Sequence, residues 1–187
     1  EEICTVSEGG SSPGYCDVWV EACEDGIDND CDGKIDYQDD GCLCMSPIVI
    51  DVLGNGFDLT NFSSGVAFDM RATGQLMRLS WIQGDDAWLV LDRNGNSVID
   101  NGLELFGNVT PQPPPPVGIS KNGFLALAEF DRPANGGNGD GVIDHNDAIF
   151  SSLRLWQDRN HNGLSEAGEL HALSVWRIAT IELDYKL

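Results

Sequence analysis

Three features of the sequence predict an α+β fold of short strands and helices organised around EF-hand-like calcium loops, behind an N-terminal disulfide-rich segment. Oxygen-bearing side chains recur at the spacing of EF-hand loops. Short apolar runs alternate with stretches rich in glycine, aspartate and asparagine. All six cysteines lie within the first 44 residues. This shift in composition predicts a disulfide-rich calcium-binding segment at residues 1–45 and a calcium-binding module at residues 46–187.

The clearest calcium loop spans residues 158–169. Loop positions 1, 3, 5, 9 and 12 carry side-chain oxygens, position 6 is Gly163, and position 7 offers a backbone carbonyl. Calcium binds six to eight oxygens, and a glutamate at position 12 can supply two of them. The predicted ligands are Asp158, Asn160, Asn162, Leu164, Glu166 and Glu169.

A second full match begins at Asp28 and carries aspartate at positions 1, 3, 5, 9 and 12. Its glycine, Gly33, stands at position 6, where the chain turns sharply. The predicted ligands are Asp28, Asp30, Asp32, Lys34 through its backbone carbonyl, Asp36 and Asp39.

Two further loops match the spacing in part. The loop at Asp92 has Ser97 in place of the glycine and Leu103 at position 12, so Glu104 is expected to close it. The loop around Asn138 has Gly136 at position 1, so either Asp131 or Asn135 must reach in. The predicted ligands are Asp92, Asn94, Asn96, Val98, Asp100 and Glu104 in the first loop, and Asn138, Asp140, Val142, Asp144 and Asp147 in the second.

A single stretch rich in Asp, Asn and Gly is more often a turn than a metal site, because these residues favour turns without any ligand. Repetition of the full ligand spacing favours calcium here, at three to four sites. The segments beginning at Asp51 and Asp69 place Leu53 and Arg71 at ligand positions and are interpreted as turns. The pair Asp85–Asp86 is open to three interpretations: a catalytic carboxylate pair, a cap or an auxiliary calcium ligand.

The charge excludes two classes of partner. With 31 acidic and 10 basic residues the chain carries a net charge of −21, so neither nucleic acid nor an anionic membrane surface attracts it. Carboxylates crowded in the loops repel one another unless a cation binds between them. Calcium removal is therefore expected to destabilise the protein markedly.

The cysteines indicate an oxidising compartment. Cys4, Cys16, Cys23, Cys31, Cys42 and Cys44 form an even, clustered set, which favours three disulfides among 15 possible connectivities. Zinc is the alternative, but no histidine precedes His145, and the pair Cys42–Cys44 is closer than the usual zinc spacing. The chain begins at Glu1 without an apolar leader and has no apolar run of 18 residues. A secreted protein without a membrane span is therefore expected.

The periodicity of residues 46–187 predicts short elements joined by polar turns. The proline-rich stretch at 111–116 is expected to be an extended loop, because proline cannot donate a ladder hydrogen bond. Helices next to the loops at 138 and 158 are expected to give helix–loop–helix units. Strands are predicted at residues 48–50, 66–70, 76–82, 87–91, 153–156 and 178–183, and helices at 123–130, 146–153 and 165–173.

An ordered series of motifs carries a family resemblance. It includes Ser46-Pro-Ile-Val-Ile-Asp51, Glu104-Leu-Phe-Gly107, Asn138-Gly-Asp-Gly141 and Leu153-Arg-Leu-Trp156-Gln-Asp158. Most of residues 46–187 resembles the calcium-dependent self-processing module of bacterial repeat-in-toxin proteins and its non-processing relatives. The resemblance implies that calcium folds the module and that an aspartate before the first proline cleaves the Asp–Pro bond through an anhydride. This chain has Ser46 at that position, which lacks the carboxylate.

The N-terminal loop resembles short metal-binding motifs of bacterial surface proteins and is similar in spacing to thrombospondin type 3 repeats. The sequence therefore favours a non-catalytic calcium-binding module at a bacterial cell surface or in the extracellular medium, with a structural or adhesive role. One alternative is autoprocessing at the Ser46–Pro47 bond, and another is a dockerin-like docking module. The apolar tail at 178–187 suggests self-assembly into a filament by donation of a strand to an identical subunit, unless it pairs within its own chain. A cell-surface protein is the other candidate partner.

Overall fold

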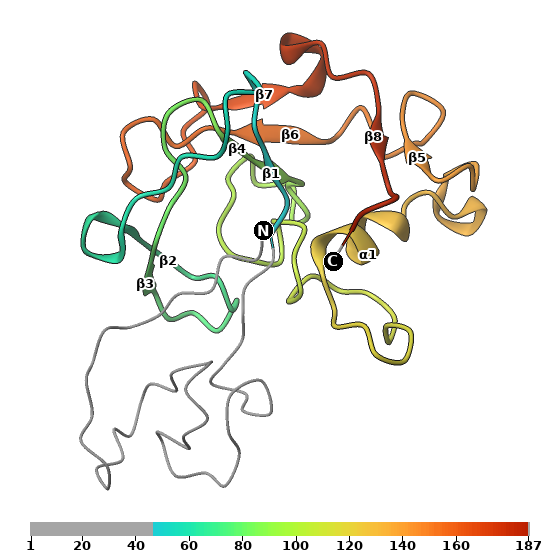
Figure 1. Ribbon diagram of the computed structural model, residues 1–187, viewed down its shortest axis with the longest axis horizontal. Coiled ribbons are helices and arrows are strands. Elements are labelled where there is room, and N and C mark those ends of the chain that lie inside the picture. The colour runs from blue at the N-terminus through green and yellow to red at the C-terminus, as the bar shows by residue number, and fades with distance from the viewer. Residues whose placement is uncertain (1–46, 187) are drawn as a thin grey trace, which may run out of the picture. The chain divides into compact units, whose positions relative to one another are not determined.

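A computed structural model describes residues 47–186, and Figure 1 shows how their elements are arranged. The centre is a four-stranded antiparallel sheet of order β1-β4-β6-β7. The strands are β1 (Val49–Ile50), β4 (Ala87–Val90), β6 (Arg154–Trp156) and β7 (Leu170–Ala172). The predicted disulfide-rich segment, its six cysteines and the loop at Asp28 lie outside the described residues.

Two smaller antiparallel pairs lie to either side of the sheet in Figure 1. One pairs β2 (Val66–Phe68) with β3 (Met77–Leu79), and the other pairs β5 (Val142–Ile143) with β8 (Ile181–Glu182). A single α-helix, α1 (Gly123–Ala128), lies on the same side as β5 and β8. Single turns of 3₁₀-helix, η2 (Phe62–Ser64), η3 (Pro133–Asn135) and η4 (Leu173–Trp176), complete the regular structure of this part of the chain.

The predicted α+β class with helix–loop–helix units is wrong, because the described residues form mostly β-structure with one short helix. The strands predicted at 48–50, 66–70, 76–82, 87–91, 153–156 and 178–183 each contain an observed strand. Of the three predicted helices, only the one at 123–130 forms. Residues 146–153 form turns, and residues 165–173 contain turns and β7. In the second segment Gly168 weakens a helix, and residues 170–172 pair with β6 instead. In the first segment Asn146, Ser151 and Ser152 favour turns over a helix.

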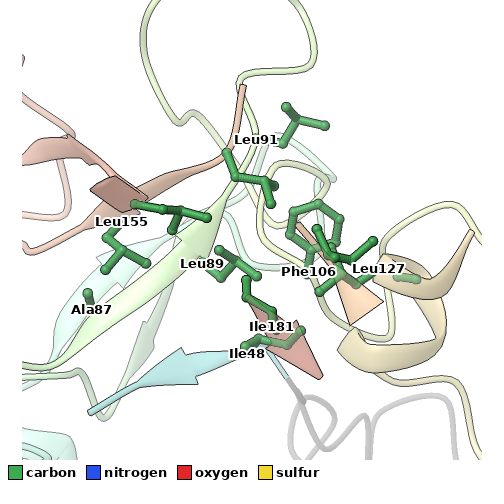
Figure 2. Packing of buried hydrophobic residues seen from close by; sticks show 12 residues of the cluster. Ile48, Ala87, Leu89, Leu91, Phe106, Leu127, Leu155 and Ile181 are labelled. Atoms are coloured by element: carbon green, nitrogen blue, oxygen red, sulfur yellow. The ribbon is translucent and has the colours of Figure 1, made fainter. Parts of the chain in front are cut away.

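The sheet is buried on both faces, which explains why β4 is a continuous apolar run. On one face, Leu89 and Leu155 pack with Phe106 and with Leu127 of α1, as Figure 2 shows. The helix approaches this core closely because Gly123 has no side chain, and a Cβ there would lie 2.2 Å from the carbonyl oxygen of Phe106.

Four aromatic rings fill the other face. The ring of Trp81 lies 5.4 Å from Phe68, 5.1 Å from Trp88 and 5.5 Å from Trp156, measured between centroids. All four side chains are at most 2% exposed. Edge-on and tilted contacts of this kind add to the free energy of apolar burial.

The C-terminal tail is engaged within its own chain. Ile181 pairs with Ile143, and the ring of Tyr185 stacks on Phe124 with the centroids 5.2 Å apart. The hydroxyl of Tyr185 accepts a hydrogen bond from the side-chain amide of Asn122 at 2.9 Å. The tail therefore pairs within its own chain, which is the intrachain alternative.

Replacing Trp81 by alanine should lower the free energy of unfolding by about 3–5 kcal/mol, because it leaves a cavity between three other aromatic rings. Urea denaturation followed by far-UV circular dichroism measures this change. Leu76→Ala is the control, since Leu76 is 71% exposed and its loss should alter stability by less than about 0.5 kcal/mol. Equal effects of the two substitutions would contradict the aromatic core.

Candidate metal sites

The loop at residues 158–169 joins β6 to β7 as the turn of a β-hairpin. Its first carboxylate, Asp158, is buried and accepts backbone N–H groups of the same loop. Asp158 Oδ1 lies 3.1 Å from the nitrogen of Asn162, and Oδ2 lies 2.8 Å from the nitrogen of Gly163. The backbone therefore winds around the side chain at position 1, as it does in a calcium loop.

The other predicted side-chain ligands of this loop are also drawn together. Glu169 Oε1 accepts the N–H of Arg159 at 3.0 Å, so the end of the loop returns to its beginning. The side-chain amides of Asn160 and Asn162 donate to Glu166 Oε1 at 3.3 and 2.7 Å. Positions 1, 3, 5, 9 and 12 thus belong to one hydrogen-bonded ring of oxygen-bearing side chains and loop backbone.

The loop that follows β4 repeats this arrangement. Asp92 Oδ1 accepts the N–H of Asn96 at 3.2 Å, and Oδ2 accepts the N–H of Ser97 at 2.8 Å. The amides of Asn94 and Asn96 donate to Asp100 Oδ2 at 2.9 and 2.7 Å. The two loops therefore place the same ligand positions in the same relation to one another.

Glu104, one residue beyond the standard spacing, reaches into this loop. Its Oε1 accepts the N–H of Arg93 at 3.0 Å, and its Oε2 accepts the N–H of Asp100 at 2.7 Å. The Glu104 backbone carbonyl accepts the N–H of Leu91 at 2.8 Å, which places its side chain beside the start of the loop. Leu103 is 37% exposed and points elsewhere, whereas Glu104 is 2% exposed.

Asp131 supplies the first carboxylate of the loop around Asn138, which is called the third loop below. Its Oδ1 accepts the N–H of Gly139 at 2.9 Å, and its Oδ2 accepts the N–H of Gly141 at 2.9 Å. The chain can cross so near because a Cβ at Gly137 would lie 2.1 Å from the carbonyl carbon of Asp131. Asn135 instead donates its amide to a backbone carbonyl 2.7 Å away. Of the two candidates that the sequence left open, Asp131 is therefore the one that reaches the loop.

Asp147 reaches back across the third loop. Its Oδ1 accepts the N–H of Asn138 at 3.3 Å, and its Oδ2 accepts the N–H of Asp144 at 2.8 Å. Asp147 is 3% exposed. The carboxylate of Asp144 itself turns to the N–H of Asn146, with Oδ1 at 2.7 Å, and so lies outside this ring of hydrogen bonds.

The predicted backbone ligands occupy equivalent places in the three loops. Each donates its N–H to the side-chain oxygen two residues before it, over 2.9 Å at Val98, 3.0 Å at Val142 and 2.7 Å at Leu164. The side chains of Val98 and Leu164 are 38% and 61% exposed, so they point to solvent while their backbone stays in the loop.

Position 6 of each loop has a left-handed backbone. The φ angle is 85° at Gly141, 71° at Gly163 and 69° at Ser97. Only glycine adopts this conformation without a steric penalty, so the serine retains the turn at a cost of about 1 kcal/mol. The departure from glycine in the Asp92 loop therefore changes the energy of the turn and not its geometry.

Electrostatics indicate that the loop at Asp158 fits a cation. Burial raises the pKa of Glu169, and the neighbouring carboxylate of Glu166 raises it further. A hydrogen bond from the amide of Asn162 lowers the pKa of Glu166. Within residues 47–186, Glu169 Oε2 is buried and receives no hydrogen bond. A buried anionic oxygen without a donor, beside a second carboxylate, is costly, and a hard cation such as calcium offsets that cost.

Two of the loops are joined directly. The N–H of Ile99, in the loop after β4, donates to Ser165 Oγ in the loop after β6 at 2.6 Å. Both residues are at most 5% exposed. Order in one loop therefore supports order in the other, although they are far apart in the sequence.

The first-position geometry alone does not identify a metal loop. In the segment interpreted as a turn, Asp69 also accepts backbone N–H groups, from Thr73 at 3.0 Å and Gly74 at 2.8 Å. Arg71 occupies its third position, where a cation would repel calcium. The acid that returns to the beginning of the loop, as in Glu104, Asp147 and Glu169, separates the three candidate sites from such a turn.

The part of the chain that carries these loops is similar to known proteins. The family model of the SPM domain matches residues 48–187. The chain is similar to the iron-regulated protein FrpA of Neisseria meningitidis serogroup C, with 40% identity over 142 residues. The match covers 75% of this chain and 12% of FrpA, so the chain spans a small part of that relative's length. Among the described residues, no helix is both long enough and apolar enough to cross a membrane.

Asp131→Ala should lower the free energy of unfolding by about 2–3 kcal/mol, because the backbone N–H groups of Gly139 and Gly141 lose their charged acceptor, a buried carboxylate. Asn135→Ala is the matched control, and we expect a change below about 0.5 kcal/mol for this exposed side chain. Chemical denaturation in the presence of a calcium chelator measures both variants without a contribution from bound ions. A larger effect at Asn135 would contradict the assignment of Asp131 to this loop.

Proposed function

Because the chain belongs to the SPM domain family, we propose that it is a non-catalytic, calcium-ordered module of an extracellular bacterial protein, with a structural or adhesive role. The observation that carries the proposal is the buried, donor-free Oε2 of Glu169 within a ring of loop oxygens. The net charge of −21 adds to it, because such a chain gains stability from bound divalent ions. Calcium is the proposed ion, since all the side-chain ligands offer oxygen.

Calcium would act here on a β-structure and not on paired helices. Asp158 and Glu169 lie at the two ends of the β6–β7 hairpin, and Asp92 and Glu104 flank a loop that leaves and rejoins β4. An ion held between each pair joins the ends of two chain segments that both enter the central sheet. The free energy of calcium binding at the loops would therefore stabilise the folded sheet against unfolding.

Two alternatives lose support from the geometry. A dockerin-like surface depends on helices beside the loops, and those predicted at 146–153 and 165–173 do not form. A filament made by donation of the C-terminal strand would require β8 to leave β5 of the same chain, with which it pairs. Assembly through other surfaces, or binding to a cell-surface protein, belongs to the proposed adhesive role.

Autoprocessing is the remaining alternative, and it is tied to the Ser46–Pro47 bond. The resemblance to calcium-dependent self-processing modules supports it, together with the position of Pro47 directly before the buried Ile48 and β1. Serine lacks the carboxylate that would form an anhydride with its own backbone carbonyl carbon. For this reason we propose a module without peptide-bond chemistry.

Glu169→Gln should have opposite effects with and without calcium. The glutamine can still accept the Arg159 N–H, and it removes the repulsion with Glu166, so the chelated protein should keep or gain stability. Calcium binding at this loop should weaken at least tenfold, about 1.4 kcal/mol, because a charge and bidentate binding are lost. Thermal unfolding with chelator and with millimolar calcium separates the two effects. Equal calcium stabilisation of variant and wild type would contradict a site at Glu169.

We expect the chain to stay intact when calcium is added, because Ser46 cannot start the anhydride reaction. Intact-mass spectrometry before and after calcium addition tests this expectation. Ser46→Asp is the comparison variant, since it restores the carboxylate next to Pro47 without altering the loops. Release of a fragment that begins at Pro47 from the unmodified chain would replace the structural proposal by autoprocessing.

A further inference from the structure

Three carboxylates outside the predicted loops meet at one end of the β1–β4 pair. Ile50 pairs with Ala87, so Asp51 and Asp86, the adjoining residues of these two strands, face each other. Asp85 lies beside them, and one oxygen from each of the three carboxylates lies within 4.8 Å of the other two. The sequence left Asp85–Asp86 open between a catalytic pair, a cap and an auxiliary calcium ligand, and it interpreted the Asp51 segment as a turn, so it did not join the three residues into one site.

One oxygen of the group is buried without a hydrogen-bond donor. Asp86 Oδ2 accepts the N–H of Asp58 at 2.6 Å, whereas Oδ1 receives no hydrogen bond within residues 47–186. Asp86 is 3% exposed, so water reaches this oxygen poorly. A buried anionic oxygen on a carboxylate that lies beside two more carboxylates calls for a positive charge. Burial raises the pKa of Asp86, and Asp51 and Asp85 raise it further by repulsion.

The surrounding chain holds the other two carboxylates in place. Asp51 accepts the N–H groups of Gly54 at 2.7 Å and Gly56 at 2.7 Å, as the first residue of a calcium loop does. Asp85 Oδ2 accepts the N–H of Leu53 at 3.0 Å. The position-3 residue Leu53 has no side-chain oxygen, which is why this segment reads as a turn in the sequence. Asp85 and Asp86, from a distant part of the chain, supply the oxygens that the local sequence lacks.

An amide adds a fourth oxygen-bearing group. Asn55 stands at position 5 after Asp51, and its Nδ2 donates to Asp85 Oδ1 at 3.0 Å. The nitrogen and oxygen of an amide exchange places by rotation about one bond, so the same side chain can present its oxygen to a cation. Leu53 and Asn55 are exposed, which leaves the group open to ions from solvent.

We propose that Asp51, Asp85 and Asp86 form a further calcium site, with Asn55 as an added ligand. The ion joins the end of β1 to the start of β4, two strands of two and four residues whose pairing is otherwise short. Hard oxygen ligands and a side open to water suit calcium, which accepts six to eight oxygens in irregular geometry. The site deepens the proposed calcium-dependent function but uses none of the residues of the three loops.

The number of calcium ions bound per chain tests this site. Equilibrium dialysis of the full chain with radioactive calcium should give one ion fewer for Asp86→Asn than for the wild type. The asparagine keeps an acceptor for the Asp58 N–H, so the fold should remain, and circular dichroism with tryptophan emission checks it. Asp85→Asn is a second variant at a half-buried residue and should lose the same ion. Asp58→Asn is the matched control, because it removes a nearby exposed charge outside the group and should leave the number unchanged.

The outcomes separate this proposal from the proposed function. At a calcium concentration too low to fill the weakened Glu169→Gln loop, the double variant Asp86→Asn/Glu169→Gln should bind two ions fewer than the wild type and each single variant one fewer, which shows that the two sites are distinct. Wild-type numbers of bound calcium in both Asp86→Asn and Asp85→Asn would overturn the further site and leave the three loops untouched. A wild-type chain that binds no calcium would overturn both proposals.

Discussion

Buried carboxylates that accept backbone N–H groups are the constraint on which the rest of this fold depends. The described strands have two to four residues each, so their ladders hold few hydrogen bonds. The loops between them are longer than the strands, and those that follow β1, β2, β4 and β6 each wind around an aspartate near the beginning. Hydrogen bonds from the loop N–H groups to this side chain fix the backbone of the loop, as the turn residues do in a tight hairpin. Seven acids are buried in this way or beside such loops: Asp69, Asp86, Glu104, Asp131, Asp147, Asp158 and Glu169.

This arrangement couples the charge of the protein to its hydrophobic core. Leu91 and Asp92 are neighbours in sequence, and so are Trp156, Gln157 and Asp158, so the side chains that fill the core continue directly into the acidic loops. The contact between Ile99 and Ser165 links the two loops further. A change in the charge of one loop therefore reaches both strands that form the middle of the sheet. In a chain with a net charge of −21, bound cations offer the simplest way to keep these acids together.

The chain corresponds to a small part of the similar protein FrpA. It matches 12% of the length of FrpA, so the activity of a whole relative cannot be assigned to these residues. Its described part has one sheet with both faces packed and three similar loops, an arrangement that suits a structural domain within a longer protein. Ser46 stands where the peptide-bond chemistry of the similar self-processing modules would need a carboxylate.

Local spacing in the sequence predicted which oxygen-bearing side chains of each loop lie together, because residues that could surround one ion must follow a fixed order. It also located most strands, since their apolar runs are bounded by glycine and aspartate. Tertiary structure decided the rest. Residues 170–172 form a strand because they pair with β6, which outweighs a weak helical pattern, whereas residues 146–153 form turns. Asp131 enters its loop from outside the spacing, and Asp85 and Asp86 meet Asp51 only through the register of β1 and β4. Such contacts depend on which strands lie side by side, and no local pattern encodes that choice.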